Sequence, residues 1–382
     1  MNSLKIHPGR GRILTFNPVF LLRNGTSTTR TRRHHLAGQI SASAVVIALL
    51  FVMNCGGKPK GELHLYPALI GTSRGYIDQQ GRVRIKPRFS SAREFSEGIA
   101  AISIGEKWGF IDSNGKVVAE PQFDAVEDFS EGFATVREGD HWGMVDKSGV
   151  LLFLGEFLLV RKMHDGLAIV RTASGWGFLD RKGKFALPPR YSYVGDFSEG
   201  LALAYDDEKK KDGYINKQGI FEIPAQFAMA SDFSEGMAAV RIGGKWGFID
   251  RKGNSVIEPQ FDEVADGHYR SGFKDGLAAV KLKGKLGYID KGGHLAIPFS
   301  FEEARDFSEG LAGVMQDEQW GFIDHQGKWV IKPTFQDVSN FIGGIAKVWE
   351  GPTWSNLNWK IRFINRSGES IWEPRQWHSW VY

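Results

Sequence analysis

The sequence predicts an all-β protein made of nine tandem repeats, each a three-stranded β-meander. One short stretch recurs along the chain, and Lys245–Gly253, with the sequence KWGFIDRKG, is a well-formed copy. The glycine at its third position recurs at spacings of 34, 34, 34, 36, 34, 40 and 34 residues, which indicates a repeat array. A content of 47 glycines and 13% aromatic residues suits many short strands joined by tight turns.

The three strands of one repeat can be placed within residues 233–262. Alternating and β-branched apolar residues predict strands over 237–242, 245–249 and 255–258. A lone three-stranded sheet of this length buries too little surface to be stable, so each sheet must stack on its neighbours. We count nine such units, from Leu65 to about Trp377.

The two turns of this repeat have the residues that tight turns require. Gly243 and Gly244 form a two-residue hairpin loop, where positive φ angles are needed. The side chain of Asp250 can accept a hydrogen bond from the backbone two residues on, and Gly253 can adopt the left-handed conformation. Pro259 cannot donate to a strand ladder, so it should end the third strand or lie at an edge.

The other recurring positions have structural explanations as well. Trp246 offers a large apolar surface, and Gly247 allows a neighbouring backbone or ring to approach closely. Phe233 and Phe261, just outside the strands, are the predicted plugs between repeats. The full Trp-Gly pair occurs at Trp108-Gly109, Trp142-Gly143, Trp176-Gly177, Trp246-Gly247 and Trp320-Gly321, and we interpret all ten residues as structural.

The array could be open or closed. Nine is an unusual number of blades for a propeller, and uneven insertions suit an open form, so we expect an open β-superhelix or solenoid. The alternative is a closed β-propeller.

In these features the sequence resembles the WG-repeat family, also called KWG repeats, which occur in many copies in bacterial proteins, frequently lipoproteins. The resemblance rests on Trp-Gly, the aromatic-Ile-Asp that follows, the turn glycine, Pro-x-Phe and Phe-Ser-Glu-Gly in register. It implies an all-β repeat scaffold with a binding role, and it brings no catalytic residues.

The N-terminal segment has the features of an export signal. Three arginines within 30–33 precede a ten-residue apolar run at 44–53, which is too short to span a membrane comfortably. The only cysteine, Cys55, follows directly and resembles the lipidated residue of a bacterial lipobox, although Asn54 departs from the usual small residue before it. We therefore expect a lipid anchor at Cys55, which would tether the protein to a membrane of the cell envelope, facing the periplasm or the cell surface.

Three parts of the chain follow from this: a basic segment with a signal peptide at 1–55, a linker at 56–64, and the array at 65–382 with a Trp-rich C-terminal cap. The formal net charge of +4 is misleading, since residues 1–55 hold seven basic and no acidic residues. The remainder has 41 basic against 44 acidic residues, which argues against nucleic acid as a partner.

Sequence signatures of catalysis are missing. There is no pair of histidines four residues apart within the array, no Cys-x-x-Cys and no phosphate-binding loop. The recurring aspartates are interpreted as turn formers rather than calcium ligands. We expect no cofactor, no metal and no enzymatic activity; a hydrolase with its site in the inserted loops is the less favoured alternative.

Irregular segments are where a binding site is expected. The insertion at 267–272 and the loop at 351–357 carry polar and aromatic side chains, and the C-terminus is rich in tryptophan. The candidate binding residues are His268, Tyr269, Arg270, Trp354, Trp372 and Trp377.

Residues 150–160 (VLLFLGEFLLV) interrupt the repeat pattern, because this unit has no Pro-x-Phe. We favour a strand pair buried on both faces, and the alternative is an exposed apolar patch for a partner.

The predicted function is that of a membrane-anchored scaffold that binds a protein, a glycan or peptidoglycan. The alternative is a purely structural envelope protein. The sequence does not determine the oligomeric state and is compatible with a monomer.

Overall fold

The computed structural model describes residues 63–264, 272–351 and 360–373, all within the unit Lys60–Tyr382. These residues form 34 β-strands and no helix. Six residues with a predicted role lie outside the described residues: Cys55, His268, Tyr269, Arg270, Trp354 and Trp377.

The strands form nine antiparallel sheets, which we call blades 1 to 9 in chain order, and each blade is one continuous stretch of chain. Blades 1 to 3 contain β1 (Tyr66–Ile70), β2 (Ser73–Ile77), β3 (Val83–Phe89); β4 (Ser91–Ala92), β5 (Ile99–Ile104), β6 (Lys107–Asp112), β7 (Val117–Phe123); and β8 (Ala125–Val126), β9 (Phe133–Glu138), β10 (His141–Asp146), β11 (Leu151–Gly155). Blades 4 to 6 contain β12 (Leu159–His164), β13 (Leu167–Thr172), β14 (Gly175–Leu179), β15 (Phe185–Tyr191); β16 (Ala202–Asp206), β17 (Lys211–Ile215), β18 (Phe221–Phe227); and β19 (Met229–Ala230), β20 (Met237–Ile242), β21 (Lys245–Asp250), β22 (Ser255–Phe261). Blades 7 to 9 contain β23 (Glu263–Val264), β24 (Leu277–Leu282), β25 (Lys285–Asp290), β26 (Leu295–Phe301); β27 (Glu303–Ala304), β28 (Ala312–Gln316), β29 (Gln319–Ile323), β30 (Trp329–Phe335); and β31 (Asp337–Val338), β32 (Ile345–Glu350), β33 (Lys360–Asn365), β34 (Ser370–Trp372).

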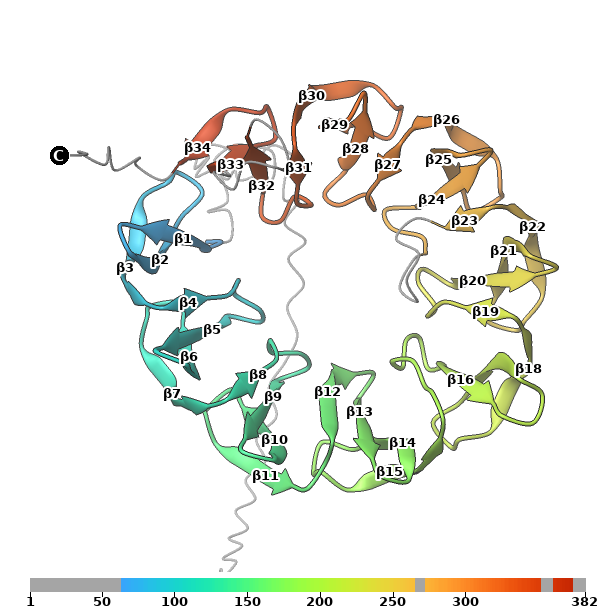
Figure 1. The fold of residues 1–382 in the computed structure, drawn as a ribbon, viewed down its shortest axis with the longest axis horizontal. Helices are drawn as coiled ribbons and strands as arrows, with labels where there is room; N and C mark the ends of the chain where they lie inside the picture. The colour runs from blue at the N-terminus through green and yellow to red at the C-terminus, as the bar shows by residue number, and fades with distance from the viewer. Residues whose placement is uncertain (1–62, 265–271, 352–359, 374–382) are drawn as a thin grey trace, which may run out of the picture. The chain divides into compact units, whose positions relative to one another are not determined.

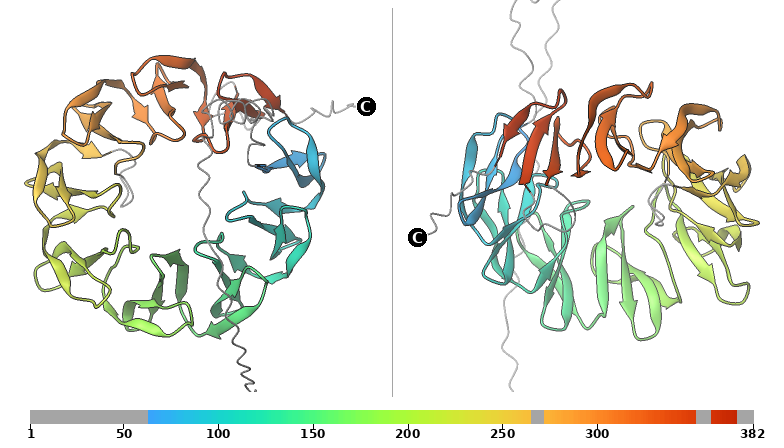
Figure 2. Two further views of the ribbon diagram at one scale, coloured as in Figure 1. Left: turned by 180° about the vertical axis from the view of Figure 1, so that it is seen from behind. Right: turned by 45° about the horizontal axis from the view of Figure 1, so that its top comes forward.

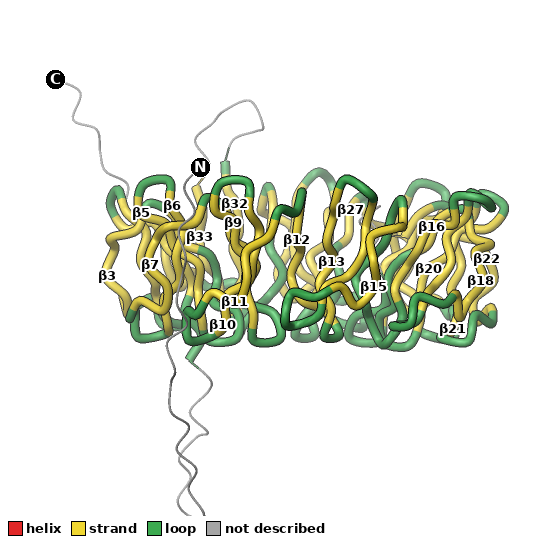
Figure 3. The backbone as a smooth tube through the Cα atoms, turned by 90° about the horizontal axis from the view of Figure 1, so that it is seen from below, coloured by secondary structure: helices red, strands yellow, loops and turns green. Residues whose placement is uncertain are grey.

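The blades stand side by side in a ring (Figure 1). In each blade the last strand faces outward and the short first strand, where present, faces the ring axis. The strands run between two rims of loops (Figure 3). We call the rim with the Phe-Ser-Glu-Gly corners and the aspartate turns the turn rim, and the rim with the hairpins between the second and third strands of a typical blade the hairpin rim.

The all-β class and the nine repeats are confirmed, and the described residues adopt the closed propeller, our alternative, rather than the open superhelix that we favoured. Blade 1 lies beside blade 9 in both views of Figure 2. The hydroxyl of Tyr66 in β1 donates to the carbonyls of Ile342 and Gly343 just before β32, at 2.9 Å each. Tyr66 and Ile77 also share an apolar cluster with Phe363 of β33. The ring closes because these first and last repeats bury apolar surface against each other.

The predicted strands of the repeat are present, but a fourth was missed. The strand predicted at 237–242 matches β20, and the second and third run longer, to Asp250 and Phe261. The two-residue β19 was not predicted, because such a short segment carries no periodicity of its own. Pro259 lies inside β22, which is an edge strand, as one of the two predictions for it required.

The core lies between blades rather than inside any one of them. The ring of Phe233, from blade 6, packs against that of Tyr214, from blade 5, with centroids 4.8 Å apart. Phe261 is 3% exposed and clusters with Phe273 of the next blade. Both predicted plugs are thus confirmed. Seven interfaces have such an aromatic pair, with centroids 4.7 to 5.1 Å apart: Tyr76–Phe95, Phe110–Phe129, Phe178–Phe197, Tyr214–Phe233, Phe248–Phe273, Tyr288–Phe307 and Phe322–Phe341.

The glycine of the Trp-Gly pair lets the outer strand cross closely. A Cβ atom at Gly247 would lie 2.4 Å from the carbonyl oxygen of Ile257 and 2.7 Å from the nitrogen of Pro259. Opposite this glycine the register shifts, so that Trp246 pairs with Phe261 and Phe248 with Ile257. The outer strand therefore bulges over the glycine, and the proline belongs to that bulge.

Candidate functional site

The recurring aspartates stabilise turns. Asp250 Oδ1 accepts hydrogen bonds of 2.9 Å from the backbone N–H groups of Lys252 and Asn254. The same pair of bonds occurs at Asp78, Asp112, Asp146, Asp180, Asn216, Asp290, Asp324 and Asn365. A hydrogen bond from the side chain of Asn254, together with those from the backbone, lowers the pKa of Asp250 and favours its ionised form.

The acidic residue of each Phe-Ser-Glu-Gly corner joins one blade to the next. Its carboxylate accepts hydrogen bonds of 2.5 to 3.1 Å from backbone N–H groups of the following corner. We call this series the carboxylate ladder: Glu97 to Glu131 and Gly132, Glu131 to Gly166, Asp165 to Gly200, Glu199 to Gly236, Glu235 to Gly276, Asp275 to Gly310, and Glu309 to Gly343 and Gly344. All seven acidic residues have φ between 49° and 54°, a conformation that costs an L-residue about 1 kcal/mol or more.

A basic residue completes most rungs of this ladder. It directly follows the turn aspartate of the next blade, so that Lys147 lies 3.0 Å from Glu97 and Arg181 lies 3.1 Å from Glu131. Lys291 pairs with Glu235, while Lys217 and His325 contact the backbone carbonyls of Asp165 and Asp275. These corners are therefore structural joints, and their recurring carboxylates serve to connect neighbouring blades.

The lysine of the KWG stretch forms a second type of joint, on the hairpin rim. It pairs with the acidic residue that follows Pro-x-Phe, in Lys107–Asp124, Lys245–Asp262 and Lys285–Glu302. Each of these acids also accepts a backbone N–H from the hairpin of the next blade, at Gly139, Lys283 and Glu318.

The Trp rings of the Trp-Gly pairs differ in burial, and only that of Trp320 is buried. Trp320 is 9% exposed, whereas Trp108, Trp142, Trp176 and Trp246 are half-buried. Arginine side chains cover several of these rings. The guanidinium carbon lies 4.8 Å from the ring centroid in Arg93–Trp108 and Arg305–Trp320, 5.9 Å in Arg137–Trp142, and 5.6 and 5.3 Å for Arg161 and Arg171 over Trp176.

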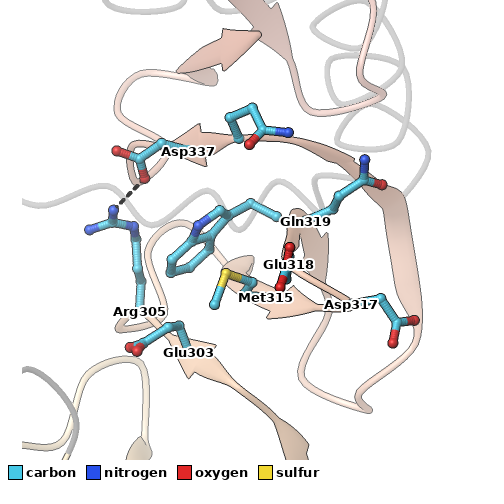
Figure 4. Close-up of a pocket in the computed structure, with 9 residues that line it drawn as sticks. Glu303, Arg305, Met315, Asp317, Glu318, Gln319 and Asp337 are labelled. Carbon is cyan, nitrogen blue, oxygen red and sulfur yellow. Dashed lines mark hydrogen bonds and ion pairs between the residues drawn. The ribbon is translucent and has the colours of Figure 1, made fainter. Parts of the chain in front are cut away.

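The best candidate site is a groove of about 670 Å³ between blades 8 and 9 on the hairpin rim (Figure 4). It is lined by Glu303, Arg305, Met315, Asp317, Glu318, Gln319, Trp320, Gln336 and Asp337. Arg305 and Asp337 form an ion pair of 2.7 Å across it. The remaining lining carries three carboxylates and no further cation, so the groove is anionic around one aromatic ring.

Two local departures from the repeat produce this groove. Blades 2, 6 and 7 have a lysine and an acid in an ion pair at these positions, whereas blade 8 has Gln319 and Gln336, so no ion pair closes the space. The hairpin beside it is formed by Asp317 and Glu318, with φ of 51° and 61°. Among the described hairpins this is the only one in which both positive-φ residues are not glycine. A left-handed backbone at a residue other than glycine costs free energy, and residues strained in this way cluster at functional sites.

One buried carboxyl outside the groove also stands out. Asp212 takes the place of tryptophan in blade 5, is 6% exposed, and burial raises its pKa to about 6 against a hydrogen bond from the N–H of Ala230. A raised pKa in a cleft would indicate an acid–base catalyst, but Asp212 lies inside the packing between strands. Within the described ranges, no group of three or more His, Cys, Asp or Glu side chains is arranged to hold a metal ion.

Of the residues predicted to bind a ligand, only Trp372 is described. It is half-buried in the cluster between blades 9 and 1, with its ring 5.6 Å from that of Phe363. The groove residues were not predicted. The paired change from Lys and Asp or Glu to Gln319 and Gln336 was a signal that a comparison of the repeats could have found.

Repeated four-stranded blades around an axis define a β-propeller, a class of scaffold on which many binding sites are built. The family model "WG containing repeat" matches residues 75–108, 108–141, 176–209, 213–246, 246–285, 287–320 and 320–348, more than half of the chain. The chain therefore belongs to the WG-repeat family.

The similarity to a solved structure at a TM-score above 0.5 concerns the fold alone. A eukaryotic initiation factor is 11% identical with a TM-score of 0.59, over 82% of this chain and 95% of that one. Dihydro-heme d1 dehydrogenase NirN is 12% identical with a TM-score of 0.46, over 82% and 73% of the two chains. No curated protein matches the sequence. The described part of the chain has no helix long and apolar enough to cross a membrane.

Proposed function

We propose that this propeller is the non-enzymatic binding module of a membrane-anchored lipoprotein of the bacterial cell envelope. The observation that carries the proposal is the groove between blades 8 and 9. The recurring polar residues are committed to joints between blades, whereas the groove residues depart from the repeat and leave carboxylates beside Trp320.

The chemistry of the groove favours a positively charged protein segment. Asp317 and Glu318 bring two carboxylates to its edge, and Glu303 adds a third. Trp320 lines the groove with the small part of its ring that stays exposed, because the side chain is 9% exposed and Arg305 covers one face. A lysine or arginine side chain of a partner would meet opposite charge and an apolar floor, which together provide attraction and orientation. A glycan or peptidoglycan is the alternative ligand.

A titration of the full-length protein with short peptides tests this proposal. We expect peptides with lysine or arginine beside an apolar residue to bind, and their glutamate counterparts not to bind. The variant Asp317→Asn/Glu318→Gln should weaken binding about tenfold or more, since each lost charge pair removes about 1 kcal/mol. The matched control is Asp207→Asn/Glu208→Gln, an exposed acidic pair on the blade 5 hairpin. Binding of soluble peptidoglycan fragments instead would favour the glycan alternative, and no saturable binding to either would favour a purely structural role.

The lipid anchor needs a separate test. Metabolic labelling with a palmitate analogue should mark the wild-type protein and not the Cys55→Ala variant. An unlabelled wild-type protein would remove the anchor from the proposal and leave the binding module unaffected.

A further inference from the structure

The outer strand of blade 3, β11, differs from the outer strands of all other blades except blade 9, where the three-residue β34 also has no proline and a single register shift. In blades 1, 2 and 4 to 8 the outer strand contains a proline, at Pro87, Pro121, Pro188 and Pro189, Pro224, Pro259, Pro298 and Pro333. Those strands also have two register shifts against the third strand of their blade. β11 has no proline and a single shift, between Met144 and Val145 of its partner strand.

Proline and bulges are devices by which proteins keep edge strands from pairing with other chains. Proline removes a donor from the free edge, and a bulge twists the edge away from a flat ladder. β11 lies at the free end of its sheet, in the order β11-β10-β9-β8, on the outside of the ring (Figure 1). Blade 3 therefore presents to solvent a strand edge with less protection than most: it has no proline, and its single bulge is at Leu152.

The side chains of this edge are apolar, neutral and exposed. Leu151, Leu152 and Leu154 are each 40% exposed, and Val150 next to the strand is 54% exposed. The burial that we favoured from the sequence for 150–160 is therefore wrong for these leucines, because no following blade covers the outer edge. The alternative, an exposed apolar patch, describes them.

We propose that β11 pairs antiparallel with β11 of a second copy of this chain, so that the protein dimerises edge to edge about a two-fold axis. With the axis at Phe153, Leu152 lies opposite Leu154 of the partner, and Leu154 opposite the partner's Leu152. Cross-strand apolar pairs of this kind stabilise sheets, and the pairing extends each four-stranded blade into one eight-stranded sheet.

Charge is the reason to choose a second copy as the occupant. In a symmetric antiparallel pair, every residue meets a residue of the same strand, so a charged strand brings like charges together. The outer strand of blade 1 shows the contrast: with its axis at Lys86, Arg84 would face the partner's Arg88. Residues 150–155 carry no charge at all, so β11 can pair with β11 of a second copy without bringing like charges together.

A charge-swap experiment on the full-length protein tests this pairing. Sedimentation velocity should show a dimer for the wild type, and monomers for both Leu152→Lys/Leu154→Lys and Leu152→Glu/Leu154→Glu, because each variant places like charges opposite. An equimolar mixture of the two variants should restore the dimer, since lysine then faces glutamate at both positions. The matched control, Val256→Lys on β22, is 45% exposed on an outer strand with a proline and should leave the dimer unchanged.

Three results would overturn the proposal: a monomeric wild type, a dimer that persists in the lysine variant, or a mixture that stays monomeric while both variants keep the wild-type thermal transition. If the doubly charged variants unfold, Leu154→Gln replaces them, with an expected rise in the dissociation constant of at least about tenfold. An unchanged dissociation constant in that variant would also contradict the pairing.

Discussion

The interfaces that follow blades 2 to 8 differ from the closing interface between blades 9 and 1. At each of the seven, a corner carboxylate accepts hydrogen bonds from the next blade. At the closing interface that corner residue is Gly343, and the aligned glycine of blade 1 is replaced by His64. The hydroxyl of Tyr66 makes the contact instead, with the carbonyls of Ile342 and Gly343.

The basic residues follow the same division. The position after the turn aspartate or asparagine is basic in blades 3 to 9: Lys147, Arg181, Lys217, Arg251, Lys291, His325 and Arg366. In blades 1 and 2 this position is Gln79 and Ser113, which are not basic. The corner acid of the preceding blade is also missing in both cases, with Gly343 in blade 9 and Leu63 in blade 1. The corner acid of one blade and the basic residue of the next are therefore present together or absent together. We infer that the two residues act as one structural element.

The largest effect is expected from breaking the closing interface. Tyr66 is 4% exposed, so Tyr66→Ala should lower the free energy of unfolding by about 3–5 kcal/mol, and hydrogen exchange should increase first in blades 9 and 1. Tyr66→Phe, which removes only the hydroxyl, should cost about 1–2 kcal/mol. Unchanged exchange in these two blades would mean that Tyr66 does not hold the ring closed.

The next largest loss of stability is expected when a side chain is introduced at Gly343, the corner position where the carboxylate ladder is interrupted. A side chain at Gly343 would place its Cβ 2.4 Å from Cγ of His64 and 2.6 Å from the Tyr66 hydroxyl, at φ of 60°. Gly343→Ala should therefore cost about 2–4 kcal/mol in a chemical denaturation experiment. The control is Gly344→Ala, where φ is 84° and nothing lies within 4 Å, with an expected cost of about 1 kcal/mol. Equal costs at both positions would show that the closing interface tolerates a side chain.

A smaller effect is expected within the ladder. Glu309→Ala removes two hydrogen bonds, to Gly343 and Gly344, and keeps the left-handed backbone, so we expect a loss of about 2 kcal/mol. Glu309→Gly should recover about 1 kcal/mol of it, because glycine adopts this conformation without strain. If alanine and glycine were equally destabilising in thermal melts, the backbone at Glu309 would not be strained.

The smallest effect is a pH dependence. Burial raises the pKa of Glu97, but Lys147 and the N–H groups of Gly132 and Glu131 outweigh it, so that the pKa is lowered overall. A lowered folded-state pKa contributes stability above the unfolded value of about 4.3, and this contribution is lost as the pH falls below it. Wild-type stability should therefore fall more than that of Glu97→Gln between pH 5 and pH 3, in urea titrations at each pH. Parallel curves would contradict this role of the charge.

Local features of the fold could be predicted from the sequence because their causes are local. The hairpin at Gly243 and Gly244 and the turn at Asp250 depend on a few adjacent residues, and both occur where predicted. The corner glutamates recur visibly in the sequence, but their hydrogen-bond partners lie a whole repeat away along the chain. The groove depends on Gln319 and Gln336, which a comparison of the repeats could have found, and on what the neighbouring blade leaves uncovered, which it could not.

The sequence by itself determined the number of repeats, the strands and turns within each, and the need for neighbouring sheets to stack, because hydrophobic periodicity and turn chemistry act over short distances. Only the tertiary structure decided that the array closes, since closure depends on the small rotation that side-chain packing sets at every interface and that accumulates around the ring. It also decided which edges and side chains stay uncovered. For that reason the groove beside Trp320 and the bare edge of β11 became visible only when the blades were placed side by side.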